Sequence, residues 1–127
     1  MVNYKPAGYH AVTPYLTVQG VNKLIDFLKG AFNATEVKAC HTTDDGTIMH
    51  AEVLIGDSWI MVGQASEQHL AKPTNLYTYV PNCDEVYQKA MSLGAKCEGP
   101  AGPRGEGFYA GYFRDADGNK LCAFVSG

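Results

Sequence analysis

The sequence has no apolar run that approaches the roughly 18 residues needed to cross a bilayer. Its first ten residues, MVNYKPAGYH, lack the apolar centre of a secretory signal peptide. It also has no Lys/Arg cluster, and a net charge of −3 offers no positive surface to a phosphate backbone. We therefore expect a cytoplasmic protein whose partners include neither a membrane nor a nucleic acid.

Paired cysteines are missing as well. No two of the four cysteines stand in a C-x-x-C pair, so a structural zinc site of the usual spacing is not expected. In a reducing compartment the thiols stay free, and free cysteine usually behaves as a small buried apolar residue. The four residues are Cys40, Cys83, Cys97 and Cys122.

What is present is an ordinary globular composition in 127 residues, which is enough for one domain with a hydrophobic core. A strand is predicted over 12–18, and an apolar stripe then predicts an amphipathic helix from Val21 to Phe32. Three more strands follow at 35–41, 47–55 and 59–62. The first half therefore has the order β-α-β-β-β.

The second half repeats this order. A strand at 76–80 precedes a helix that Asn82 can cap, with Glu85 at the reciprocal capping position, and Gly94 ends that helix. Short strands are predicted at 95–97, 108–114 and 120–124. The glycine- and proline-rich stretch 98–107 is predicted to be a mobile loop, a lid over a cavity whose charged contacts are Arg104 and Glu106.

Two landmarks share one offset between the halves. Val18 and Val80 precede the two helices at an offset of 62 (80 − 18), and Gly56 and Gly118 precede the last strand of each half at 62 (118 − 56). A common offset at independent positions indicates duplication. We predict one domain over 1–127, with module one at 9–63, a linker at 64–74 and module two at 75–125.

The segments VTPYLTV, KGAFNA, DGTIMHAEVLIGDSWIMV and FRDADGNKLCAF resemble the vicinal oxygen chelate superfamily, which includes glyoxalase I, bleomycin-resistance proteins and extradiol dioxygenases. The first three segments are similar to its PhnB-like branch, and the last is similar to a glyoxalase-type ending. The resemblance implies an α+β fold of two tandem β-α-β-β-β modules that form an incomplete barrel around a small-molecule cavity. It also implies a homodimer.

The resemblance further implies metal ligands on the first and last strand of each module. In this sequence those positions are Thr13, Ile60, Asn75 and Cys122. Of these side chains only a thiolate is a competent ligand for a catalytic divalent ion, and one ligand does not hold a metal. We therefore expect no cofactor, with a divalent metal possible only at a non-standard site. Cys122 is expected to be a passive wall of the cavity or a reactive or metal-binding thiol.

His50 and Glu52 are the candidate catalytic residues. Alternate residues of a strand share a face, so Met49, Ala51 and Val53 should lie under the helix while His50 and Glu52 face the cavity. A His and a carboxylate at this spacing can act as an acid–base pair or bind a metal, or they can simply line a polar pocket. His10, His41 and His69 are expected at the surface; the predicted cavity lining is Thr13, Trp59, Ile60, Asn75, Tyr77, Tyr109, Tyr112 and Cys122.

Two functions remain open at this point. A binding protein that sequesters a small organic molecule is favoured by the loss of the usual metal ligands. An enzyme, either a metal-dependent or acid–base lyase or isomerase or one of dioxygenase type, is favoured by His50 and Glu52. A third reading, a protein-interaction module, would require a large exposed aromatic patch.

Overall fold

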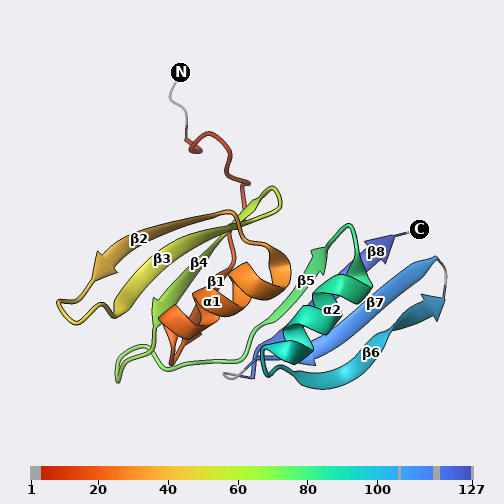
Figure 1. Ribbon diagram of the computed structural model, residues 1–127. Coiled ribbons are helices and arrows are strands. Elements are labelled where there is room, and N and C mark those ends of the chain that lie inside the picture. Colours follow the sequence, from red (N-terminus) through yellow and green to blue (C-terminus); the bar gives the residue numbers. More distant parts are fainter. Residues whose placement is uncertain (1–3, 106, 116–117, 127) are drawn as a thin grey trace.

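The computed structural model describes residues 4–105, 107–115 and 118–126, with the side chains of residues 120 and 122–126 outside the description. Two β-α-β-β-β modules follow one another along the chain (Figure 1). The first consists of β1 (Tyr15–Val18), α1 (Val21–Phe32), β2 (Glu36–Thr42), β3 (Ile48–Ile55) and β4 (Ser58–Gln64). The second consists of β5 (Asn75–Tyr79), α2 (Cys83–Ser92), β6 (Lys96–Gly105), β7 (Phe108–Arg114) and β8 (Lys120–Ser126).

Each module builds its own four-stranded sheet with the same topology. Sheet A has the order β1-β4-β3-β2 and sheet B the order β5-β8-β7-β6. In both sheets the first strand pairs in parallel with the last, and the remaining pairs are antiparallel. The predicted α+β class and the duplicated module order are therefore confirmed, and both sheets are open.

The two helices begin and end for different reasons. Helix α1 has no side-chain cap and is held by a buried apolar stripe that includes Leu24 and Leu28; it ends at Asn33, which is left-handed at φ 56°. Helix α2 is capped as predicted, because the Asn82 side chain accepts a hydrogen bond from the Glu85 N–H. It ends before Gly94, whose φ of 94° few other residues adopt.

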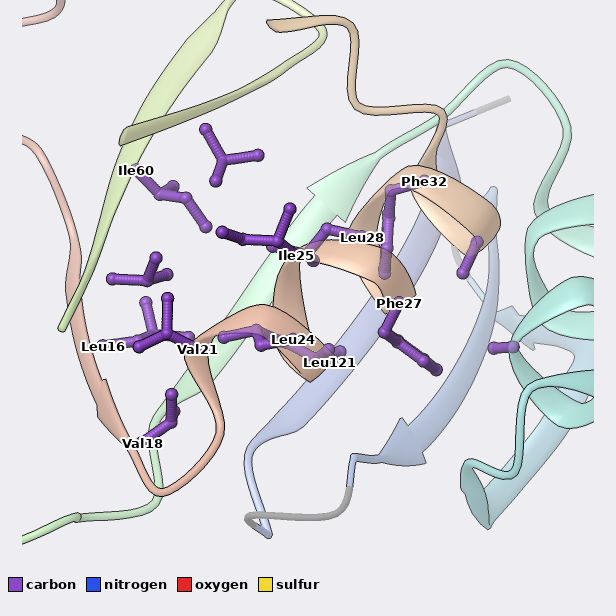
Figure 2. Packing of buried hydrophobic residues seen from close by; sticks show 14 of the residues in the cluster. Leu16, Val18, Val21, Leu24, Ile25, Phe27, Leu28, Phe32, Ile60 and Leu121 are labelled. Atoms are coloured by element: carbon purple, nitrogen blue, oxygen red, sulfur yellow. The ribbon is translucent and has the colours of Figure 1, made fainter. Parts of the chain in front are cut away.

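Helix α1 packs between the two modules and joins their cores. Figure 2 shows its apolar side chains pointing toward sheet A on one side, while Phe27 extends toward the second module. The ring of Phe113 from β7 lies 6.2 Å from the ring of Phe27 and 5.9 Å from that of Phe32. Residues of both sheets therefore share one hydrophobic cluster.

The prediction of a loop over 98–107 is wrong for the residues that the structure describes. Ten residues, Lys96–Gly105, form strand β6, which pairs with β7 through three register shifts. Its prolines are tolerated because β6 is an edge strand with one neighbour. Arg104 lies with its guanidinium 5.1 Å from the ring centre of Tyr112, so this stretch is part of sheet B and not a lid; Glu106 lies outside the described residues.

Several predicted boundaries shift by a few residues. The first strand begins at Tyr15 rather than at position 12, and the segment 65–74 joins the two modules without forming a helix or strand. Among the described residues no helix is long and apolar enough to span a membrane.

Candidate functional site

The face of sheet A that points away from α1, here called the open face, carries the predicted polar residues. On β3, Ala51 and Val53 are buried in the core, whereas His50 and Glu52 are half-buried on the opposite face. The alternation predicted from the sequence is therefore confirmed for this strand. His10, His41 and His69 are exposed, as expected.

An aromatic pair with a cation lies on this open face. The rings of Tyr9 and Trp59 are nearly parallel, at an interplanar angle of 10°, with their centres 5.2 Å apart. The Lys38 ammonium is 4.5 Å from the ring centre of Trp59 and 5.5 Å from that of Tyr9, both within cation–π range. Trp59 is only 7% exposed, so its indole is shielded from water.

Glu52 completes this group, which we call the Tyr9 cluster: Tyr9, Lys38, Glu52 and Trp59. Lys38 on β2 lies directly opposite Glu52 on β3. A hydrogen bond to the Glu52 carboxylate raises the pKa of the Tyr9 hydroxyl above its ordinary value, and Lys38, whose Nζ is 3.5 Å from that hydroxyl, partly offsets the rise. The hydroxyl therefore lies between an acceptor and a cation.

The Tyr9 cluster borders a hollow of about 420 Å³ between the N-terminal segment and sheet A. This volume lies within the roughly 300–1,000 Å³ of small-molecule sites. Two of the predicted site residues, Thr13 and Glu52, line it. Met61, Pro6 and Lys38 are further lining residues.

His50 is held by Tyr15 rather than by Glu52. The Tyr15 hydroxyl is 3.4 Å from His50 Nδ1, and the two rings stack at 5.6 Å between centres. Gly63 on β4 makes this possible, because a Cβ at that position would lie 2.2 Å from the Tyr15 hydroxyl. A glycine is thus required where the tyrosine ring crosses β4 to reach the imidazole.

Ile60 does not face this site. It is 4% exposed, belongs to the hydrophobic core and points toward α1 in Figure 2. The residue of β4 that lies opposite Tyr15 is Met61, just as Cys122 lies opposite Tyr77 in the second module. The prediction from the sequence is therefore wrong for β4, where Met61 and not Ile60 is the equivalent of Cys122. The cause is the length of the turns: two residues join β3 to β4, whereas five join β7 to β8, so counting from the turn glycine misplaces the register by one.

The predicted site residues of module two are spread over both sides of sheet B. Asn75 and Tyr77 are exposed on β5, and Tyr112 lies under Arg104. Tyr109 lies on the helix side instead, where its hydroxyl donates a 2.6 Å hydrogen bond to Asp84 of α2. Cys122 belongs to β8 by its backbone register, and its side chain lies outside the described residues.

A second hollow, of about 330 Å³, lies between the β3–β4 turn and β5. Ile60 and Tyr77 both line it, so two predicted site residues do meet there. Its polar side is formed by His10, whose Nδ1 is 3.3 Å from Ser58 Oγ and whose Nε2 is 4.0 Å from Asp57. This hollow is a weaker candidate for a ligand site, because the polar groups His10, Asp57 and Ser58 are exposed or contact one another.

The residues present do not fit the metal that the resemblance implies. The corrected positions in module one are Thr13 and Met61, and neither a neutral hydroxyl nor a thioether is a usual ligand for a catalytic divalent ion. Within the part of the chain that the structure describes, no group of three or more His, Cys, Asp or Glu side chains is placed to hold a metal ion.

Sequence reasoning missed three residues of the site: Tyr9, Lys38 and Tyr15. Lys38 could have been found from its place on a strand beside β3, since cross-strand Lys–Glu pairs are favourable neighbours. Tyr9 had no comparable signal, because it precedes the first strand and reaches the site through the path of the N-terminal segment.

Comparisons with known proteins place the chain among proteins of one superfamily. Residues 9–123 match the profile of the Glyoxalase/Bleomycin resistance protein/Dioxygenase superfamily. No curated protein matches the chain.

Solved structures with the same fold have little sequence identity to it. TioX from Micromonospora sp. ML1 is 18% identical with a TM-score of 0.74, over 92% of this chain and 98% of that one. A fosfomycin resistance protein, FosX from Listeria monocytogenes complexed with Mn(II) and sulfate, is 21% identical with a TM-score of 0.67, over 93% and 90%. A PhnB protein from Bacillus cereus is 16% identical with a TM-score of 0.69, over 91% and 99%. Identities this low establish the fold alone.

Proposed function

Since the chain belongs to the glyoxalase/bleomycin resistance protein/dioxygenase superfamily, we propose that it is a small-molecule-binding protein whose organic ligand lies on the open face of sheet A. The observation that carries this proposal is the hollow of about 420 Å³ bordered by the Tyr9 cluster. Tyr9 and Met61 line this hollow and supply apolar contact area, and Lys38 and Glu52 supply one cation and one carboxylate for directional contacts, which is the usual composition of a ligand site.

The chemistry of the donor set supports binding rather than metal-assisted catalysis at the superfamily's usual positions. Thr13 and Met61 are suited to contact an organic molecule through a hydroxyl and a polarisable thioether. The structure of FosX from Listeria monocytogenes, which has the same fold, is a complex with Mn(II).

We further propose that two copies of the chain associate as a homodimer that extends the site. The open side of sheet B carries large aromatic side chains with high exposure: Tyr77 at 58%, Tyr79 at 67% and Phe108 at 41%. Aromatic residues of this kind are enriched in interfaces between proteins. Light scattering during size-exclusion chromatography tests this point, and a monomer at all concentrations would contradict it.

A ligand screen tests the binding proposal. The chain has a single tryptophan, Trp59, so its fluorescence reports on the site without interference from another indole. We expect at least one class of organic molecule to change this fluorescence and to raise the melting temperature, as a ligand that binds only the folded state must. A Trp59→Leu variant should lose the affinity as judged by the melting temperature, while an absence of ligands across chemically diverse libraries would contradict the proposal.

A second candidate function is acid–base catalysis by His50. The observation in its favour is the contact with Tyr15, which fixes the imidazole on the open face beside Glu52. A titration with Ni²⁺, Zn²⁺, Mn²⁺ and Fe²⁺, beside a His50→Ala variant, tests the metal-dependent form of this candidate, in which His50 is a metal ligand rather than an acid–base group. Tight stoichiometric binding that the variant loses would favour a relocated catalytic metal site over the metal-free binder.

A further inference from the structure

The N-terminal segment places one of its own side chains in the candidate site. Tyr9 is half-buried, whereas its neighbours from Tyr4 to Gly8 are exposed. Its ring stacks on Trp59, and its hydroxyl lies between Glu52 and Lys38. The phenol of Tyr9 therefore covers the indole of Trp59 with its ring and contacts both the Glu52 carboxylate and the Lys38 ammonium with its hydroxyl.

The contacts that hold Tyr9 are few. Its backbone N–H donates to the Pro6 carbonyl, a bond within the segment, so this bond does not tie the segment to sheet A. The described side-chain contacts of Tyr9 with sheet A are the stack on Trp59, the cation–π contact with Lys38 and the hydrogen bond to Glu52, and contacts of these kinds are weak where water reaches them. Contacts of this size allow an open state in which Tyr9 leaves Trp59 at a measurable population.

We propose that Tyr9 is a built-in competitor for the ligand site, and that the natural ligands carry a hydroxylated aromatic ring that replaces the Tyr9 phenol on Trp59. In the open state the ligand ring stacks on the indole. Its hydroxyl donates to the Glu52 carboxylate, and the Lys38 ammonium donates to the oxygen of that hydroxyl. This inference rests on the proposed function and names the class of ligand for the same site.

The charges of the site favour a phenol over an organic cation. Lys38 already holds its ammonium over Trp59, at 4.5 Å from the ring centre, so a cationic ligand would meet a like charge there. A ligand carboxylate at the hydroxyl position would meet Glu52 in the same way. A neutral hydroxyl has both a donor and two acceptor lone pairs, and it suits both neighbours.

The hollow beside the cluster fits a ligand larger than one ring. It has a volume of about 420 Å³, and Glu52, Met61 and Pro6 are among the residues that line it. A substituent on the ligand ring would enter this space without displacing Trp59 or Lys38. The phenol ring is thus the recognition group, and the hollow receives the remainder of the molecule.

The experiment compares two probes on two proteins. The probes are 4-hydroxyphenylacetamide and phenylacetamide, which differ by the hydroxyl alone, and the proteins are the full chain and its Tyr9→Ala variant. Binding is followed by Trp59 fluorescence and by ligand-observed NMR. We expect the variant to bind the hydroxylated probe roughly tenfold more tightly than the unaltered chain does, since removal of the competitor raises the fraction of competent sites. We also expect the variant to bind phenylacetamide more weakly than it binds 4-hydroxyphenylacetamide.

Two further variants separate recognition from general effects. A Tyr9→Ala/Glu52→Gln double variant should lose the preference for the hydroxylated probe, because the charged acceptor is gone. Leu70→Ala removes an apolar side chain that is 66% exposed and does not line the hollow, and it should leave both affinities unchanged. Circular dichroism checks that each variant is folded; if Tyr9→Ala is not, Tyr9→Leu takes its place.

Each result decides between the inference and its premise. Equal affinity of the two proteins for 4-hydroxyphenylacetamide would overturn the competitor role of Tyr9. Binding of some other ligand class at Trp59, with neither phenol preference nor an effect of Tyr9→Ala, would overturn this inference and leave the proposed binding function standing. If no ligand of any class affects Trp59 in either protein, the proposed function fails as well.

Discussion

The two modules share a topology, and one cross-strand row of residues in each sheet shows how their chemistry differs. In sheet A a cross-strand row runs over β1, β4, β3 and β2 through Tyr15, Met61, Glu52 and Lys38. In sheet B the equivalent row runs over β5, β8, β7 and β6 through Tyr77, Cys122, Tyr112 and Gly99. A charged pair in the first module thus corresponds to a tyrosine and a glycine in the second.

This difference explains why the candidate site lies on sheet A. The Lys38–Glu52 pair gives that face a cation and an acceptor, and the N-terminal segment lines an open hollow beside them. In sheet B, Gly99 leaves room for the Tyr112 ring, whose nearest atom would be 3.0 Å from an added Cβ. The two modules therefore share a backbone topology, while this face is polar in the first module and aromatic in the second.

The largest expected effect concerns the junction between the modules. Phe113 is fully buried and touches Phe27 and Phe32 of α1, so Phe113→Ala should lower the free energy of unfolding by about 3–5 kcal/mol. Urea denaturation followed by circular dichroism measures this. The matched variant Phe108→Ala, at a side chain 41% exposed on the same strand, should cost far less.

A single cooperative transition in both variants would show that the modules unfold together despite their different faces. Two separated transitions in Phe113→Ala would instead show that module one folds without module two, which would contradict the role of α1 as a shared element.

The next prediction tests which residue of β4 lies on the open face. Ile60 is a core residue and Met61 lies on the open face, so Ile60→Ala should cost about 2–5 kcal/mol and Met61→Ala about 1 kcal/mol or less. The same denaturation experiment compares them. Equal losses of unfolding free energy in the two variants would contradict the conclusion that Met61, rather than Ile60, occupies the position in sheet A that Cys122 occupies in sheet B.

A smaller effect is expected at alkaline pH. The pKa of Tyr9 is raised above its ordinary 10.0 by the hydrogen bond to Glu52. The stabilisation from this contact is therefore present below about pH 10 and is lost as the pH rises through the raised pKa. Trp59 fluorescence between about pH 9 and pH 12 should show a step that is absent in Tyr9→Phe. The same step in both proteins would assign it to another group.

The smallest effect concerns Gly63. A Cβ there would displace the hydroxyl end of the Tyr15 ring, which is half-exposed and can move, so Gly63→Ala should change the unfolding free energy little. It should nevertheless separate Tyr15 from His50. The NMR shifts of the imidazole protons report on this, because stacking at 5.6 Å produces a ring-current shift that the variant should lose. Unchanged imidazole shifts would mean that Tyr15 does not hold His50.

Local signals in the sequence predicted much of the fold. The stripe of α1, the Asn82 cap of α2 and the alternation along β3 depend on neighbours three or four residues away at most, and the structure confirms all three. Strand β6 could not be predicted in this way. Its glycines and prolines indicate a loop, and only the pairing with β7, a tertiary contact, makes it a strand.

The candidate site was predictable in part for a similar reason. Strand alternation placed His50, Glu52 and the buried Ala51 correctly. The same alternation could also have excluded Tyr109 from the predicted cavity lining, because Tyr109 and the core residue Phe113 are four residues apart on β7 and so lie on the same face of the sheet. The contribution of Tyr9 depends on where an irregular segment returns to the sheet, and no periodic pattern records that path.

The proline content of β6 has a consequence for how this protein can associate. Pro100 and Pro103 lack the backbone N–H that a neighbouring strand would use, so the outer edge of sheet B offers an interrupted template to another chain. The register shifts along β6 distort this edge further. Strand-by-strand growth of sheet B into an extended aggregate is therefore obstructed at this edge by the same residues that make the segment resemble a loop.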